Sequence, residues 1–134
     1  TMVLPAMEAA KRLQQEGVTA TVVNCRFLKP FDERVLTDLL KRHHRILTLE
    51  EGAVANGFGA FISREITDRL AGAEEAPRLR MRSLGIPDAF VQHGPRARLL
   101  ADIGLDVDGI TKAAARLVDG RVPAPRASAT LESA

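Results

Sequence analysis

Arg26-Phe27-Leu28-Lys29-Pro30-Phe31-Asp32 is followed, one predicted helix later, by Leu47-Thr48-Leu49-Glu50-Glu51-Gly52 and by Gly57-Phe58-Gly59. Each half of this pattern marks the end of a strand and the loop after it, and a helical period follows each loop. A chain that alternates strands and helices in this way is typical of an α/β fold with a parallel sheet. The second loop is rich in glycine and acidic residues, and it follows the carboxyl end of a strand, where open parallel sheets hold their ligand and partner surfaces.

Outward from these loops, the hydrophobic periods predict eight elements in the order α-β-α-β-α-β-α-α. We expect strands at residues 19–23, 46–49 and 79–84, and a short helix at residues 96–102. The first helix should end at Gly17, because glycine suits the left-handed residue that follows many helices. Asp32 and Asp106 are expected to cap the helices after them, since a short acidic side chain can accept from free N–H groups of the first turn.

These elements predict a three-layer α/β/α fold with a mostly parallel sheet. The predicted domain covers residues 1–119, in which residues 71–77 form a surface connection. Residues 120–134 are rich in proline, alanine and serine and are expected to be a disordered tail. Three strands make a thin sheet, and a helix that opens the chain usually follows a strand in this architecture. We therefore expect the domain to be incomplete at its N-terminus, with a first strand that precedes Thr1 and is missing from this chain.

The composition is that of an ordinary globular domain without a membrane span. The 134 residues fit one domain, and 46% hydrophobic residues are too many for a disordered chain. The 19 basic and 17 acidic side chains leave a net charge of +2, which by itself implies neither a nucleic-acid nor a membrane partner. Apolar stretches fall short of the roughly 20 residues that a membrane span needs. Cys25 is the only cysteine, so no internal disulfide can form and a cytoplasmic location is expected.

The loop after the second predicted strand contains our candidate contact residues, which are Glu50, Glu51, Asn56, Gly57, Phe58 and Gly59. Gly57-Phe58-Gly59 at a helix start could present N–H groups to a phosphate. The alternative is that the glycines permit tight turns and close packing of the helix on the sheet. Glu50 and Glu51 point to opposite faces of a strand, so they should hold the loop or pair with an arginine rather than act together as acid and base.

The remaining histidines and the cysteine suggest no catalytic or metal-binding set. His43 and His44 end a helix, where neighbouring positions diverge too far to bind one metal ion. His93 lies in a predicted loop, without an acid or nucleophile at a suitable spacing. Cys25 is expected to be a small apolar core residue. We therefore predict no catalytic residue and no metal site in this chain.

Arg78, Arg80 and Arg82 alternate along the third predicted strand. They form a solvated face, a protected edge, or a basic stripe for an anionic partner. The chain has no Trp or Tyr and only 4% aromatic residues, so it lacks the rings on which bases stack. No nucleic-acid partner is therefore predicted.

Several short motifs occur in an order and spacing that resemble one enzyme family. They are the stretch Arg26 to Asp32, Thr48 to Gly52 with Gly57 to Gly59, Leu84-Gly85-Ile86-Pro87-Asp88, His93-Gly94, and Gly104-Leu105-Asp106 before Gly109-Ile110. From Thr1 to about Val118, the chain resembles the C-terminal domain of the 1-deoxy-D-xylulose-5-phosphate synthases, which are thiamine-diphosphate enzymes of the transketolase superfamily. Asn56 departs from this pattern, in which glycine is usual at that position, and Ala60 stands where serine is common.

The resemblance implies a full enzyme that condenses pyruvate with glyceraldehyde 3-phosphate, with loss of carbon dioxide. The product, 1-deoxy-D-xylulose 5-phosphate, feeds isoprenoid, thiamine and pyridoxal synthesis. The resemblance also implies that thiamine diphosphate and Mg²⁺ are bound by two preceding domains, and that no cofactor is bound by this chain alone. This segment is then expected to be structural and dimer-stabilising, with the preceding domains and a homodimer partner as its partners.

Two other interpretations remain open from the residues. The chain could be the matching domain of a transketolase or of a 2-oxoacid dehydrogenase β subunit, although Leu84 to Asp88 with His93-Gly94 favours the synthase. It could also be a stand-alone module that binds an anion or another protein through the helix start at Gly57 to Gly59.

Overall fold

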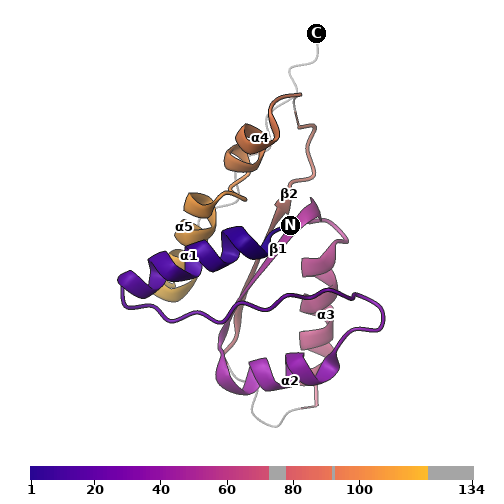
Figure 1. Cartoon of the computed structure of the whole chain (residues 1–134). Coiled ribbons are helices and arrows are strands. Elements are labelled where there is room, and N and C mark those ends of the chain that lie inside the picture. The colour runs from indigo at the N-terminus through magenta and orange to yellow at the C-terminus, as the bar shows by residue number, and fades with distance from the viewer. Residues whose placement is uncertain (73–77, 92, 121–134) are drawn as a thin grey trace.

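Two parallel strands at the centre of the molecule carry helices on both faces (Figure 1). The computed structural model describes residues 1–72, 78–91 and 93–120. Strand β1 (Arg45–Ala53) pairs with β2 (Arg80–Ile86), so that Arg45 lies opposite Arg80 and Leu49 lies opposite Leu84. The described helices are α1 (Val3–Gln15), α2 (Glu33–Arg42), α3 (Phe58–Leu70), α4 (Arg96–Asp102) and α5 (Val107–Asp119).

Alternating side chains of the strands build a core on each face of the sheet. Helices α1 and α5 cover one face, where the buried residues are Met2, Ala9, Leu84, Leu105, Ile110 and Ala113, with Leu47 and Leu49 packed against them. Helices α2 and α3 cover the other face, around the buried residues Leu36, Ile62 and Ile66, with Ile46 and Met81 against them. Because successive strand residues point to opposite faces, one short sheet serves both cores. The predicted α/β/α layering is confirmed.

Helix α1 ends at the glycine that the sequence indicates. Gly17 has a φ of 81°, in the left-handed region. Its N–H donates to the carbonyl of Gln14 at 3.0 Å, and the N–H of Val18 donates to the carbonyl of Leu13 at 2.8 Å. This pair of bonds is the Schellman arrangement, which satisfies the last carbonyls of a helix.

Both predicted N-caps are confirmed. A carboxylate oxygen of Asp32 accepts from the N–H groups of Arg34 and Val35 at 3.1 and 3.2 Å at the start of α2. Asp106 accepts from the N–H of Gly109 at 2.9 Å at the start of α5. Local sequence therefore decides where these two helices begin.

The strand predicted at residues 19–23 does not form. The chain from Val18 to Phe31 is irregular, and Figure 1 shows it as a long coil between α1 and α2. Val22 and Val23 are 37% and 38% exposed. A β-branched run becomes a strand only when a neighbour completes its ladder, and β1 and β2 bond to each other instead. The chain bends at residues 28–30, where the Lys29–Pro30 peptide bond is cis.

The remaining boundaries are close to the predicted ones, with one informative difference. Strand β1 continues past Leu49 to Ala53, so Glu50 and Glu51 belong to the strand rather than to the loop after it. Its register with β2 is irregular between Leu49 and Ala53. The predicted helix at residues 96–102 is confirmed as α4. Residues 73–77 of the predicted connection and residues 121–134 of the predicted tail lie outside the described residues.

Candidate contact surface at the carboxyl edge of the sheet

The side chain of Glu50 joins the end of β1 to the start of α3. Its two carboxylate oxygens accept from the N–H groups of Phe58 and Gly59 at 2.7 and 2.9 Å. These N–H groups have no partner within the helix, and a negative charge is favourable beside a helix N-terminus. Glu50 is thus the loop-holding carboxylate that the sequence suggested. Phosphate binding at this helix start would require the same N–H donors, which the Glu50 carboxylate already occupies.

The glycines of this loop let the start of α3 lie directly on the strands. A Cβ atom on Gly57 would lie 2.2 Å from both the carbonyl oxygen of Ala53 and Oε2 of Glu50. A Cβ atom on Gly59 would lie 2.2 Å from the hydroxyl oxygen of Ser83. Real side chains do not approach so closely, so both positions exclude any side chain unless the backbone moves. The close-packing interpretation of the glycines is the one that the geometry supports.

A pair of hydroxyl groups lies directly beneath Gly59. The Thr48 hydroxyl donates to the Ser83 hydroxyl across the two strands at 2.9 Å. Thr48 is buried, so this hydrogen bond satisfies polar atoms that would otherwise be costly in the core. The carboxylate of Glu50 is committed to the start of α3 and so does not serve as a base for either hydroxyl. The pair is therefore structural.

Asn56 adopts the left-handed conformation, with a φ of 58°. Asparagine tolerates this region better than other residues with a Cβ, whereas glycine enters it without steric cost. The conformation gives a physical reason for the glycine that the resemblance leads one to expect at this position. Asn56 is exposed, and Phe58 instead packs into the core beside α2 and α3.

Glu51 points to the opposite face of the sheet and forms an ion pair with Arg96, at the start of α4. The predicted divergence of Glu50 and Glu51 is confirmed. Glu51, His93 and Arg96 form the polar rim of a cavity of about 380 Å³. The apolar lining of the cavity comes from Ile86, Val91, Leu99, Leu100, Ile103 and Leu105. Sequence reasoning missed Arg96, because 45 positions separate it from Glu51 and no local pattern connects them.

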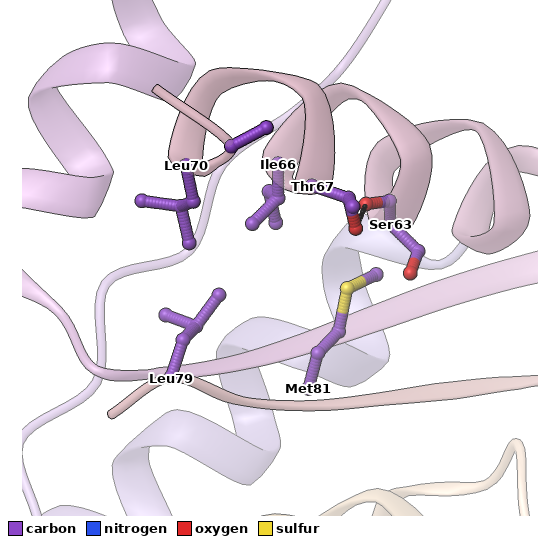
Figure 2. A pocket seen from close by; sticks show the side chains of 7 residues that line it. Ser63, Ile66, Thr67, Leu70, Leu79 and Met81 are labelled. Carbon is purple, nitrogen blue, oxygen red and sulfur yellow. Dashed lines mark hydrogen bonds between the residues drawn. The ribbon is translucent and has the colours of Figure 1, made fainter. Parts of the chain in front are cut away.

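A second cavity, of about 430 Å³, opens between α3 and the start of β2. Figure 2 shows Ile66 and Leu70 of α3 pointing towards Leu79 and Met81 across this space. Its polar lining consists of hydroxyl groups, one of which, on Thr67, already donates to the carbonyl of Ser63 at 2.9 Å. A cavity lined in this way lacks an acid, a base or an activated nucleophile, so it does not support catalysis.

The three alternating arginines lie near the amino end of β2. Arg78 and Arg80 are exposed, and Arg82 is partly buried. Arg45 lies directly opposite Arg80 in the ladder, which places two like charges side by side. None of these four arginines forms an ion pair with another described residue. These arginines therefore form a basic group near the amino ends of the strands, away from Glu50 and Glu51 at the carboxyl edge.

The histidines and the cysteine do not converge. The backbone N–H of His43 caps α2 by donating to the carbonyl of Leu39 at 2.8 Å, while His44 is exposed. Cys25 lies on the irregular segment and is exposed, so its predicted place in the core is wrong. The reason is the failure of residues 19–23 to join the sheet. Partial desolvation raises the pKa of the Cys25 thiol, which disfavours the reactive thiolate.

Across the described ranges, no group of three or more His, Cys, Asp or Glu side chains could hold a metal ion. In the same ranges, none of the helices is both long and apolar enough to cross a membrane.

A parallel sheet between two helical layers, with a glycine-rich helix start held by a strand carboxylate, defines a transketolase-type C-terminal domain. The family described as "Transketolase, C-terminal domain" matches residues 1–110, and the chain belongs to this family. A solved structure titled "Split gene transketolase, inactive beta4 tetramer" is similar, with a TM-score of 0.74 and 28% identity. The similarity covers 90% of this chain and 37% of that chain.

Curated relatives within the superfamily are named 1-deoxy-D-xylulose-5-phosphate synthase, as the sequence motifs predicted. The Geobacter sulfurreducens protein, synthase 1, is 40% identical over 127 residues, which are 94% of this chain and 19% of that protein. The Gloeobacter violaceus synthase is 41% identical over 128 residues, which are 95% of this chain and 19% of that protein. A Bacillus cereus synthase is 44% identical over 110 residues, or 82% of this chain and 17% of that protein. This chain therefore spans about a fifth of the length of these relatives.

Proposed function

We propose that this chain is the C-terminal domain of a 1-deoxy-D-xylulose-5-phosphate synthase. The single observation that carries the proposal is the 40% identity to the Geobacter sulfurreducens synthase across 94% of the chain. The full enzyme would condense pyruvate with glyceraldehyde 3-phosphate, with loss of carbon dioxide, as a cytoplasmic homodimer that uses thiamine diphosphate and Mg²⁺.

The residues that the structure describes do not fit the cofactor. Carboxylates and carbonyls bind Mg²⁺ in proteins, yet the two carboxylates at the sheet edge are already used, by the start of α3 and by Arg96. The N–H groups of Phe58 and Gly59, which could donate to a diphosphate, already donate to the Glu50 carboxylate. We therefore assign the cofactor and every chemical step to the preceding domains. The role of this chain is to provide a rigid surface for assembly.

The free edge of β1 supports a second part of the proposal. Among the described strands, β1 is paired on one edge only, by β2. Figure 1 places the N-terminus beside the carboxyl ends of the strands, where α1 begins. A parallel strand that ended at Thr1 would therefore lead directly into α1, as a strand–helix connection requires. We propose that this preceding strand completes the sheet and gives residues 19–23 a neighbour.

An activity assay on the parent polypeptide tests the main proposal. The purified full-length protein should form 1-deoxy-D-xylulose 5-phosphate from pyruvate and glyceraldehyde 3-phosphate when thiamine diphosphate and Mg²⁺ are supplied. A transketolase would instead transfer a two-carbon unit between sugar phosphates. That second candidate is favoured only by the similar split transketolase structure, whose 28% identity is lower than that of the synthases. Sugar-phosphate transfer without use of pyruvate would decide for it.

A substitution at Gly57 tests the assembly role. Gly57→Val in the full enzyme should weaken assembly more than cofactor affinity, because its side chain would displace Glu50 and the backbone at Ala53. Sedimentation and thiamine diphosphate titration measure the two properties separately. The matched control is Gly72→Ala, where a Cβ atom meets nothing within 4 Å. Unchanged assembly with loosened cofactor binding would reverse the assignment.

A further inference from the structure

The segment after β2 exposes two large apolar side chains in succession. Phe90 is 104% exposed relative to a free residue, and Val91 is 43% exposed. In Figure 1 this segment and α4 extend beyond the carboxyl ends of the strands, away from α2 and α3. Aromatic side chains contribute strongly to binding when they are buried, and contiguous exposed apolar residues are typical of interaction sites, so Phe90 with Val91 is a candidate surface for a partner.

A cavity adjoins this exposed segment. Val91 lines the cavity of about 380 Å³ together with Ile86 and Leu99, and the ion pair of Glu51 with Arg96 stands at its rim. An apolar centre beside a polar, partly exposed rim is the usual anatomy of a protein interface. The cavity and Phe90 therefore form one surface, which we call the Phe90 surface. It comprises Phe90, Val91, and the cavity edge at Glu51, His93 and Arg96.

We propose that the Phe90 surface is the docking site for a segment of the preceding domains, which covers Phe90 and inserts an apolar side chain into the cavity. This inference rests on the proposed function. The length of the relatives supports this occupant, since this chain spans only 19% of the Geobacter sulfurreducens synthase and four-fifths of such an enzyme lies elsewhere. The N-terminus also lies at the same edge of the sheet as this surface (Figure 1). A covalent link at Thr1 would therefore hold the preceding polypeptide close to the surface at a high effective concentration.

The nature of the surface also indicates the chemistry of the segment. Glu51 and Arg96 neutralise each other, so the cavity rim carries no net charge from these two residues for an ionic ligand. Val91 and Ile86 favour a branched or aromatic side chain, and the rim favours neutral polar neighbours that bond to His93 or Arg96. The occupant is thus an apolar anchor within a neutral segment, rather than a charged tail.

Cysteine labelling of the full-length enzyme tests this proposal. A Phe90→Cys variant is treated with a maleimide, and labelling at that peptide is followed by mass spectrometry. The matched control is Arg64→Cys on α3, whose native side chain is 75% exposed in a surface ion pair. We expect Cys at position 90 to react at least about tenfold more slowly than Cys at position 64 in the native enzyme, and at a similar rate after denaturation.

Three results would overturn the proposal. Equal rates at the two positions in the native enzyme would mean that the surface is free. Protection that disappears when the enzyme is diluted to monomers would mean that a second copy is the occupant. Protection that disappears only when a small apolar compound is removed from the preparation would mean that the cavity binds a ligand instead. The labelling result is independent of the reaction catalysed, so the docking proposal and the synthase proposal can fail separately.

Discussion

The junction of β1 with α3 and the segment between α1 and α2 both contain a sequence pattern typical of a strand, but only the pattern at the junction forms one. At the junction, the Glu50 carboxylate accepts from the N–H groups at the start of α3, and Gly57 and Gly59 let α3 lie close to the strands. Glu50 and these glycines lie within ten residues of sequence. In the segment from Val18 to Phe31, an equally clear β-branched run remains exposed and outside the sheet. The junction contains its own partners, whereas the segment has no strand partner among the described residues. A local pattern is therefore sufficient only where its hydrogen-bond partners are local too.

The largest expected loss of stability is at the junction of β1 with α3. Gly59→Ala should lower the free energy of unfolding by about 3 kcal/mol, because its Cβ atom would overlap Ser83 and Thr48 on the strands beneath. Gly72→Ala, which enters open space, is the control and should change it by less than about 0.5 kcal/mol. Urea denaturation measures both. A small effect at Gly59 would show that α3 can move away from the sheet at little cost.

The next largest effect concerns the carboxylate of the junction. Glu50→Ala should cost about 2–3 kcal/mol of unfolding free energy, because two partly buried N–H groups lose a charged acceptor. Glu51→Gln removes a partly exposed ion pair with Arg96 and should cost less than about 1 kcal/mol. If the two variants are equally stable in urea, Glu50 does not hold the start of α3 as described.

A smaller effect is expected where one residue caps one helix. Asp106→Ala should cost about 1 kcal/mol of unfolding free energy, because the N–H of Gly109 loses its acceptor. Asp106→Asn keeps an acceptor oxygen and should recover most of that loss. Thermal unfolding of the two variants side by side provides the measurement, and equal destabilisation by both would argue that charge rather than the cap matters.

A modest gain is expected at Asn56. Replacing this residue by glycine removes the steric cost of its φ of 58°, although it adds freedom to the unfolded chain. The net result should be a stabilisation of about 0.5 kcal/mol, detectable as a shift of the urea midpoint. A loss of stability would indicate that the asparagine side chain makes a contact that outweighs the strain.

The smallest expected effect on stability is in the irregular segment between α1 and α2. Val23→Ser should change the stability of this chain by less than about 0.5 kcal/mol, since Val23 is 38% exposed. In the full-length enzyme the same substitution should cost more, because the proposed preceding strand would bury the segment. Ile62→Ala, in the core beneath α3, is the positive control in both proteins and should cost about 2–5 kcal/mol. A large loss of stability on Val23→Ser in this chain would contradict the description of the segment as unpaired.

Elements with local signals were predicted well. The caps at Asp32 and Asp106 and the left-handed Gly17 each depend on atoms within a few residues, so periodicity and capping rules found them. The divergence of Glu50 and Glu51 followed from the geometry of a strand. The same rules failed for residues 19–23 and for Cys25, because a residue's burial depends on which strands are its neighbours.

Within the candidate surface, the six predicted residues divide into two roles that spacing alone could not separate. Glu50, Gly57, Phe58 and Gly59 are committed to holding α3 on the sheet, and Phe58 lies in a core. Glu51 and Asn56 remain at the surface. The exposed residues that share the cavity with Glu51, namely Val91 and Arg96, lie 40 or more residues further along the chain and carry no motif that links them to it.

By itself, the amino-acid sequence determined the α/β class, the helix ends and the family of this chain, because periodicity, caps and motif order are properties of neighbouring residues. Only the tertiary structure decided that Glu51 pairs with Arg96 beside a cavity, and that the run at residues 19–23 stays outside the sheet. Those outcomes depend on which atoms meet across distances of 30 or more residues, and a hydrogen bond or a packed contact exists only when both partners arrive at the same place.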